Sequence, residues 1–293
     1  MTSNRTHSLL LAALACVCCS HALLAAESKV AHADLTAAQI LEKHIAARGG
    51  LLAWHAVRAM SWTGKMDAGM ANSAARSANY VRNSRAPANK KELVQLSSAG
   101  EAAATDQQVQ LPFVLAMERP RKSRLELEFA GKTAIQVFDG NAGWKVRPFL
   151  NRNDVEPFTA QETKIVAAKP DLDGPLLDAT AQGTRVELEA REAVEGRDAY
   201  RLKLTTKSGS VQHIWIDAQS FLDVKVEGTQ RQMDGHMHNV WVYQRDFRPV
   251  QGLLIPFVLE TVVDGYRDTH KIVIEKVAVN PQLADASFSR PKA

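Results

Sequence analysis

A regular alternation of apolar and polar side chains is the feature that most limits how this chain can fold. In residues 124–129 (RLELEF) the two leucines and the phenylalanine fall on one side of an extended strand, and the charges fall on the other. Residues 185–190, 200–204 and 222–227 repeat the pattern. Strands with one apolar and one wet face are typical of antiparallel sheets. The chain is therefore expected to be mainly β (α+β), with one face of a large sheet buried.

Turn sequences between the strands support hairpin connections. Asp264 and Gly265 form a two-residue hairpin signal between apolar runs, and further Asp-Gly, Glu-Gly and Ser-Gly pairs mark other turns. We count about eleven strands and find no alternation of strands with crossover helices. A large antiparallel sheet accumulates twist and curls. The prediction is a curled antiparallel sheet with an apolar concave face.

Two helical regions interrupt the strand pattern. The first lies near the N-terminus and begins with Thr36 and Gln39 at capping-box spacing. The second covers residues 162–178 and begins in the same way, with Thr159 and Glu162. An apolar helical segment between two groups of strands needs an apolar surface to cover. The segment is therefore predicted to form a lid over the concave face of the sheet.

An apolar cavity under this lid is the predicted binding site. Because only 6% of the residues are aromatic, few large side chains are present to fill the interior of a curled sheet. An unfilled apolar interior would accept acyl chains or similar ligands. The predicted cavity and lid residues are Trp62, Leu125, Leu127, Phe129, Trp144, Ile165, Leu172, Leu176, Leu177, Leu202 and Leu204. Any one of the tryptophans could instead belong to the ordinary core of the sheet. Leu176→Asp is expected to place a charge on the underside of the lid, and so to reduce ligand retention, while the sheet stays folded.

Residues 1–33 are expected to be a secretory signal peptide. Arg5 and His7 form a basic start, residues 9–17 form an apolar core, and small-residue cleavage signals end near positions 26 and 33. This core is about half of the roughly 20 residues that span a membrane. A membrane tether, or a lipid on Cys16, is the alternative. We expect residues 34–293 to work in the periplasm as one monomeric domain.

Residues 67–111 differ in composition from the rest of the predicted domain. They are rich in alanine, serine and asparagine, carry few large apolar side chains and show no sustained period. A segment of this composition buries too little apolar surface to become ordered by itself. We expect a weakly ordered insertion within the single domain.

Charge and motif content argue against several classes of function. The 36 lysines and arginines nearly balance the 32 acidic residues, which gives no electrostatic reason to expect nucleic-acid binding. Motifs of hydrolases, zinc proteases, phosphate loops and dinucleotide sites are missing from the sequence, so no catalytic residue, enzyme activity or cofactor is predicted. His236 and His238 could converge on a metal ion from one strand face, but no spaced partner completes a site. Exposed histidines after a turn are the simpler interpretation, and no metal site is predicted.

Several stretches of the sequence resemble the LolA-like periplasmic family, whose members are called outer-membrane lipoprotein-sorting proteins. The stretches are 40–66 (ILEKHIAARGGLLAWHAVRAMSWTGKM), 138–144 (FDGNAGW), 171–178 (DLDGPLLD), 215–227 (WIDAQSFLDVKVE) and 280–291 (NPQLADASFSRP). The resemblance implies an incomplete barrel of antiparallel strands with a helical lid over an apolar cavity. It also implies a non-enzymatic carrier that binds the acyl chains of lipoproteins and meets membrane proteins of the envelope.

The sequence departs from the family pattern in two places. The insertion after Met66 falls where the family's second strand is expected, so the basic residue that braces the family's lid has no evident counterpart. No obvious protruding apolar loop marks the chain as an acceptor at the outer membrane. The alternative function is a regulatory or sensor module with the same fold, which is expected to have a collapsed cavity and a protein partner.

Overall fold

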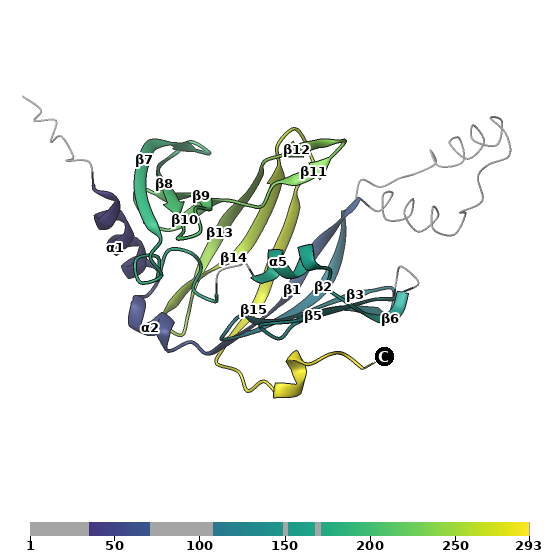
Figure 1. The fold of residues 1–293 in the computed structure, drawn as a ribbon. Helices are drawn as coiled ribbons and strands as arrows, with labels where there is room; N and C mark the ends of the chain where they lie inside the picture. The colour runs from purple at the N-terminus through teal and green to yellow at the C-terminus, as the bar shows by residue number, and fades with distance from the viewer. Residues whose placement is uncertain (1–34, 71–107, 149–151, 168–170, 293) are drawn as a thin grey trace, which may run out of the picture. The chain divides into compact units, whose positions relative to one another are not determined.

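One antiparallel sheet dominates the computed structural model, which describes residues 35–70, 108–148, 152–167 and 171–292 (Figure 1). The strands are β1 (Ala59–Met70), β2 (Gln108–Glu118), β3 (Lys122–Phe129), β4 (Lys132–Phe138), β5 (Gly143–Arg147), β6 (Arg152–Pro157), β7 (Arg185–Val194), β8 (Arg197–Thr205), β9 (Val211–Asp217), β10 (Asp223–Glu227), β11 (Arg231–Met233), β12 (His236–His238), β13 (Val240–Val250), β14 (Leu253–Val263) and β15 (His270–Val279). Thirteen of them form the sheet, in the order β6-β5-β4-β3-β2-β1-β15-β14-β13-β10-β9-β8-β7, and β11 and β12 form a separate hairpin. The mainly β prediction is confirmed, and its count of about eleven strands was too low.

The sheet curls without closing into a barrel. Its two edge strands, β6 and β7, have no pairing with each other. The helices are α1 (Ala37–Ala47), α2 (Leu51–His55), α5 (Ala160–Ala167) and the 3-10 helix η2 (Asp285–Phe288). The chain from β6 to β7 carries α5 and connects the two ends of the sheet, and Figure 1 shows α5 on the concave side, over β1 and β2. Within the predicted lid only the first part is helical, and residues 171–178 form turns.

Helix α1 begins and ends as its sequence predicts. The Thr36 hydroxyl accepts from the backbone N–H of Gln39, and the Gln39 side chain accepts from the backbone N–H of Thr36. The chain turns sharply at Gly49, where φ is +109° and a side chain would collide with the carbonyl oxygen of Gly252. At the same end, the buried Arg48 donates to the buried carboxylate of Asp223 at 2.8 Å. This pair ties α1 to β10 across the interior.

Two apolar clusters fill most of the concave side. The central cluster lies between α2 and strands β1, β2, β14 and β15, and its buried members are Trp54, Val57, Met60, Phe113, Leu177, Leu253, Ile255, Phe257 and Ile274. The distal cluster lies between α1 and strands β8 and β9, and its buried members are Ile40, Leu176, Tyr200, Leu202, Leu204, Ile214 and Ile216. Two adjacent residues of the chain, Leu176 and Leu177, therefore belong to different clusters and hold the two parts of the sheet together.

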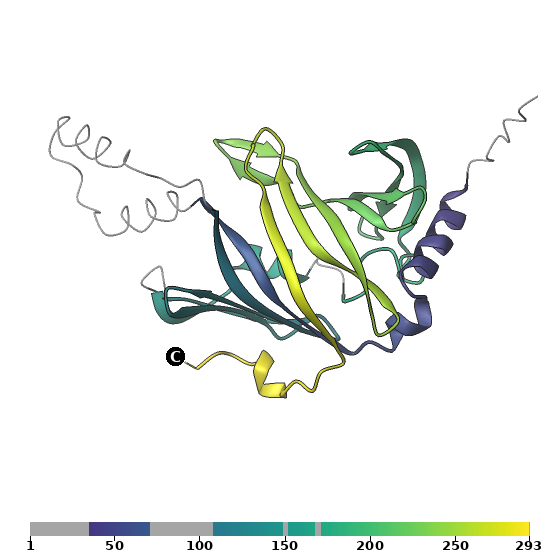
Figure 2. The same cartoon turned by 180° about the vertical axis from the view of Figure 1, so that it is seen from behind.

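The convex face of strands β3–β5 is covered as well. Figure 2 shows the C-terminal segment, in yellow, running along these strands. Arg124 on β3 donates to the backbone carbonyl of Ser287 at 3.1 Å, and the ring of Phe288 is buried beside the ammonium of Lys122. The register places Val137 opposite Arg124, and Val137 is fully buried. This part of the sheet therefore has an apolar side chain on the face away from the lid.

The predicted insertion begins later and ends earlier than the composition suggests. Residues 67–70 belong to β1 and residues 108–111 belong to β2, and Asp67 pairs with Gln110 across the ladder. The rest of the insertion, 71–107, and the predicted signal peptide, 1–33, lie outside the described residues. The second strand that the resemblance implies is therefore β2, which follows the insertion.

Candidate functional site

Half-buried apolar side chains line one part of the concave face. Trp62 on β1 lies opposite Leu115 on β2, and Leu115 lies opposite Leu125 on β3. Residues opposite each other in a ladder share a face, so these side chains form a continuous row. We call the following six residues the concave apolar face: Trp62, Met66, Leu115, Leu125, Leu127 and Ile272. Each packs against the central cluster but keeps part of its surface in contact with solvent.

Helix α5 is attached near this face by polar contacts at both ends. The ladder puts the buried Lys145 on the same face as Leu125, and its ammonium pairs with the carboxylate of Glu162 in the first turn of α5. That carboxylate also accepts from the backbone N–H of Thr159 at 2.8 Å, which completes a capping box. At the other end, Arg121 donates to the carbonyl of Ala167 at 3.1 Å. These polar contacts hold the helix in place without requiring apolar packing against the sheet.

The electrostatics of the first turn follow from this arrangement. The hydrogen bond from Lys145, and then the bond from the backbone of Thr159, lower the pKa of Glu162 from 4.5 to about 2. Glu162 is therefore ionised at any pH that a cell provides. In contrast, none of the described side chains of α5 is buried, and Ile165 is 40% exposed. The helix is therefore a cover with little apolar contact of its own.

The turn segment after α5 is anchored more firmly. Arg119 donates to the buried carboxylate of Asp173 at 3.0 Å and lies 3.4 Å from Asp171. Leu172 is half-buried against the central cluster, and Leu176 is 1% exposed within the distal cluster. Leu176 is therefore core rather than the underside of a lid, and we expect Leu176→Asp to destabilise the sheet instead of leaving it folded.

The structure brings together only some of the predicted site residues. Trp62, Leu125, Leu127, Leu172 and Leu177 share the central cluster. Leu176, Leu202 and Leu204 are buried in the distal cluster under α1. Phe129 is 36% exposed at the end of β3, and Ile165 is exposed on α5.

Trp144 lies on the wrong face for the predicted cavity. It pairs with Val137, whereas Lys145, the next residue, lies on the face of Leu125. Its ring therefore belongs to the convex side, which the C-terminal segment covers.

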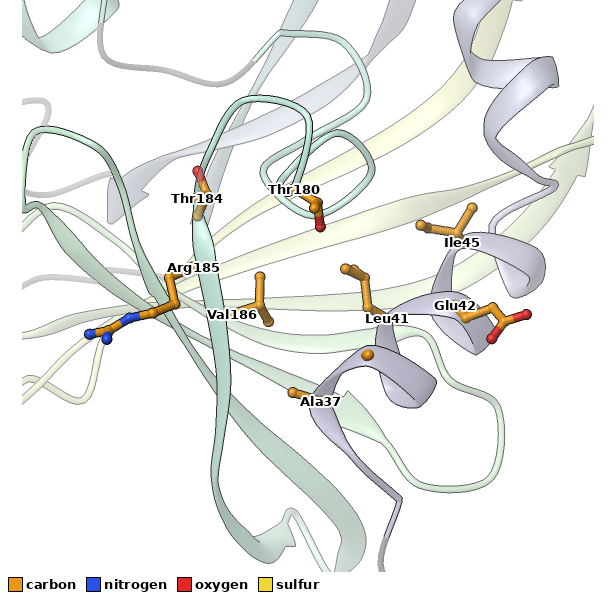
Figure 3. Close-up of a pocket in the computed structure, with 9 residues that line it drawn as sticks. Ala37, Leu41, Glu42, Ile45, Thr180, Thr184, Arg185 and Val186 are labelled. Carbon is orange, nitrogen blue, oxygen red and sulfur yellow. The ribbon is translucent and has the colours of Figure 1, made fainter.

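An apolar groove that the sequence did not suggest lies between α1 and the edge strand β7. It has a volume of about 500 Å³, and the side chains of Leu41, Ile45 and Val186 point into it (Figure 3). Thr180 and Thr184 supply polar groups at the rim. Pockets of this volume accept small ligands. One feature of the sequence could have indicated this groove. Leu41 and Ile45 are four residues apart, so they form a second apolar row on the first helix.

A second hollow, of about 800 Å³, lies where β1, β2 and the C-terminal segment meet. Its lining is mixed: Arg58, Arg119 and Asn280 lie beside Pro281 and Leu283. The side-chain Oδ1 of Asn280 accepts from the backbone N–H of Arg58 at 2.7 Å, so this side chain already connects two segments.

The histidine pair of the β11–β12 hairpin stands apart from both hollows. His238 packs against the ring of Tyr266 and its Nδ1 lies 3.0 Å from the carbonyl of Asp264. Within the described ranges, no group of three side chains is placed to hold a metal ion. In the same part of the chain, no helix is both long enough and apolar enough to cross a membrane.

Comparison with known proteins identifies the fold. No protein-family model matches the chain, and a search of curated proteins also found no match. Among solved structures, a LolA superfamily protein from Nitrosomonas europaea has a TM-score of 0.50 at 14% identity, covering 87% of this chain and 98% of that one. A DUF1329 family protein from Desulfovibrio piger has a TM-score of 0.50 at 11% identity, covering 85% and 95%. The chain has a LolA-like fold.

At these identities the likeness establishes the fold and leaves the ligand open. Within this LolA-like fold, the predicted lid segment is contacted by basic residues that the sequence pattern did not identify, among them Lys145, Arg119 and Arg121. Lys145 and Glu162 are 17 residues apart, and Arg119 and Asp173 are 54 residues apart, so sequence spacing alone does not pair them. The concave apolar face offers a continuous row of half-buried apolar side chains.

Proposed function

We propose that this protein binds the acyl chains of lipid-modified ligands, such as lipoproteins, on the concave apolar face, and that it does so in the periplasm as a monomer. The observation that carries the proposal is the half-buried state of a continuous apolar row beneath a helix that buries none of its described side chains. Each methylene group that leaves water contributes about 0.8 kcal/mol. An acyl chain laid along Trp62, Leu115 and Leu125 would therefore bind without any charged partner.

Helix α5 is the proposed movable cover. It is attached through Lys145 and Arg121, and these contacts can break without exposing a large apolar surface. The turn segment with Leu176 and Leu177 stays in place, because both leucines are core. Entry of a ligand would then displace α5 while the clusters remain packed. The proposal includes no catalytic step and no cofactor.

Matched glutamine substitutions test the proposal. Leu125→Gln places a polar group on the concave apolar face, and Val114→Gln is the control, since Val114 lies on the opposite face of the neighbouring strand and is 41% exposed. Each protein is purified gently from periplasm, and co-purified lipid is measured by native mass spectrometry. We expect lipid with the unchanged protein and with Val114→Gln, and little with Leu125→Gln. Absence of lipid from all three proteins would contradict the proposal.

A regulatory module is the second candidate, and the filling of the interior by Leu176 and Leu177 favours it. A module of this kind needs a protein partner instead of an acyl ligand. Cross-linking in cells separates the two candidates. A carrier should trap several lipoproteins, whereas a module should trap one membrane protein of the envelope.

A further inference from the structure

One tryptophan on the concave apolar face differs from others in the hydrogen bonding of its indole. The indole N–H of Trp54 donates to the carbonyl of Arg48 at 3.0 Å, and that of Trp215 donates to the Glu192 carboxylate at 2.6 Å. The indole nitrogen of Trp62 is buried and has no hydrogen-bond partner among the described residues. A buried donor without an acceptor destabilises the folded state by about 1 to 3 kcal/mol. Such a group in a native fold needs an explanation.

The surroundings of Trp62 supply no acceptor from neighbouring side chains. Its cross-strand partners are Leu115 on β2 and Val277 on β15. On the same face of β1, its neighbours are Met60 and Gly64. A trapped water needs two to four polar partners, and an apolar neighbourhood of this kind does not provide them. The described residues therefore leave this donor free for an acceptor that a ligand would supply.

We infer that the indole N–H of Trp62 binds the carbonyl oxygen of an acyl ester, so that the ligand class is an esterified acyl chain rather than a plain hydrocarbon or an ether lipid. The inference rests on the proposed function, because it places the ligand on the same face. A single donor within an apolar site fixes the orientation of a ligand at little cost in desolvation. With the carbonyl at Trp62, the hydrocarbon tail extends along Leu115 and Leu125, which follow in the same row.

The ring of Trp62 is half-buried while its nitrogen is covered. A ligand therefore reaches the ring first and the N–H after neighbouring apolar side chains move. Displacement of α5 is the movement that the attachment of this helix allows. The indole N–H of Trp62, which has no acceptor among the described residues while it is covered, would then donate to the ester carbonyl. Binding of the ester is thereby linked to opening of the cover.

The test compares two lipids that differ only at the proposed acceptor: a diacylglycerol ester and the dialkylglycerol ether of equal chain length. Trp62→Phe removes the N–H and keeps an aromatic ring. Trp241→Phe is the control, since Trp241 packs with Trp215 on the convex side of the sheet. We expect Trp62→Phe to weaken binding of the ester about three- to tenfold, the range of one net hydrogen bond, and to leave ether binding nearly unchanged. Trp241→Phe should change neither.

A second measurement uses the unchanged protein, so it does not depend on the folding of a variant. In a proton–nitrogen correlation spectrum, the Trp62 indole signal should move to lower field with the ester and move less with the ether. Equal weakening of both lipids by Trp62→Phe, or equal movement of the signal, would overturn the inference while leaving the proposed function intact. If the unchanged protein binds neither lipid, the proposed function fails, and the inference fails with it.

Discussion

The ion pair between Lys145 and Glu162 gives the sharpest prediction about the cover. Glu162→Gln removes the charge but keeps a side chain that completes the capping box at this position of a helix. The folded pKa of Glu162 is about 2, against 4.5 for an ordinary glutamate, and a difference of about 2.5 pKa units corresponds to about 3 kcal/mol. Because the Glu162 side chain is 39% exposed, solvent screening reduces the contribution to about 1 kcal/mol. Local opening of α5 should therefore become about fivefold more frequent.

Amide hydrogen exchange of residues 160–167 measures this opening directly. The faster exchange should be confined to α5, with the exchange of β1 and β2 unchanged. Lys145→Met in the same background should recover part of the protection, because it removes the buried ammonium that Glu162→Gln leaves without a partner. Unchanged exchange in α5, or loss of protection throughout the sheet, would refute the account of a cover attached by polar contacts.

The same pair predicts how the cover responds to pH. A carboxylate whose pKa is lowered by folding stabilises the folded form fully above its pKa in the unfolded chain, here about 4.5. The stabilisation is lost as the pH falls toward the folded pKa of about 2. Protonation of Glu162 should therefore not change the exchange protection of α5 between pH 5 and 8. Leu176→Ala should lower the free energy of unfolding by about 2 to 5 kcal/mol in urea denaturation, whereas Val211→Ala, at a 49% exposed position, should have little effect. Arg48→Met should cost about 3 to 5 kcal/mol, since it leaves the buried Asp223 without its partner, and Arg248→Met at the surface should cause no measurable change. A smaller loss for Arg48→Met than for Arg248→Met would contradict the buried pair.

Local chemistry made much of the fold predictable. The two capping boxes, at Thr36 and Thr159, appear in the structure at the predicted spacing, because each depends only on residues three apart. The alternation in residues 124–129 became β3 because one face of that strand meets the central cluster. The LolA-like fold itself followed from the order of these elements and from the resemblance of several stretches.

The site was harder to predict because it depends on which face of the sheet each covering segment packs against. The apolar pattern alone predicts Trp144 on the concave face, yet the C-terminal segment with Phe288 also covers the opposite face. The local pattern around Leu176 predicts a helical lid, and only its packing against Ile40 of α1 shows that this side chain is core. The partnership of Arg119 with Asp173 spans 54 residues, a separation at which sequence periodicity carries no information.

The most direct test of the account is to map where an acyl chain lies. A fatty-acid ester with a photoreactive group near its carbonyl is bound to the unchanged protein and cross-linked, and the labelled residues are found by mass spectrometry of peptides. The account predicts labels on Trp62 and its neighbours Leu115 and Leu125. Labels confined to the groove at Leu41 and Val186, or spread over the convex face, would contradict binding on the concave apolar face.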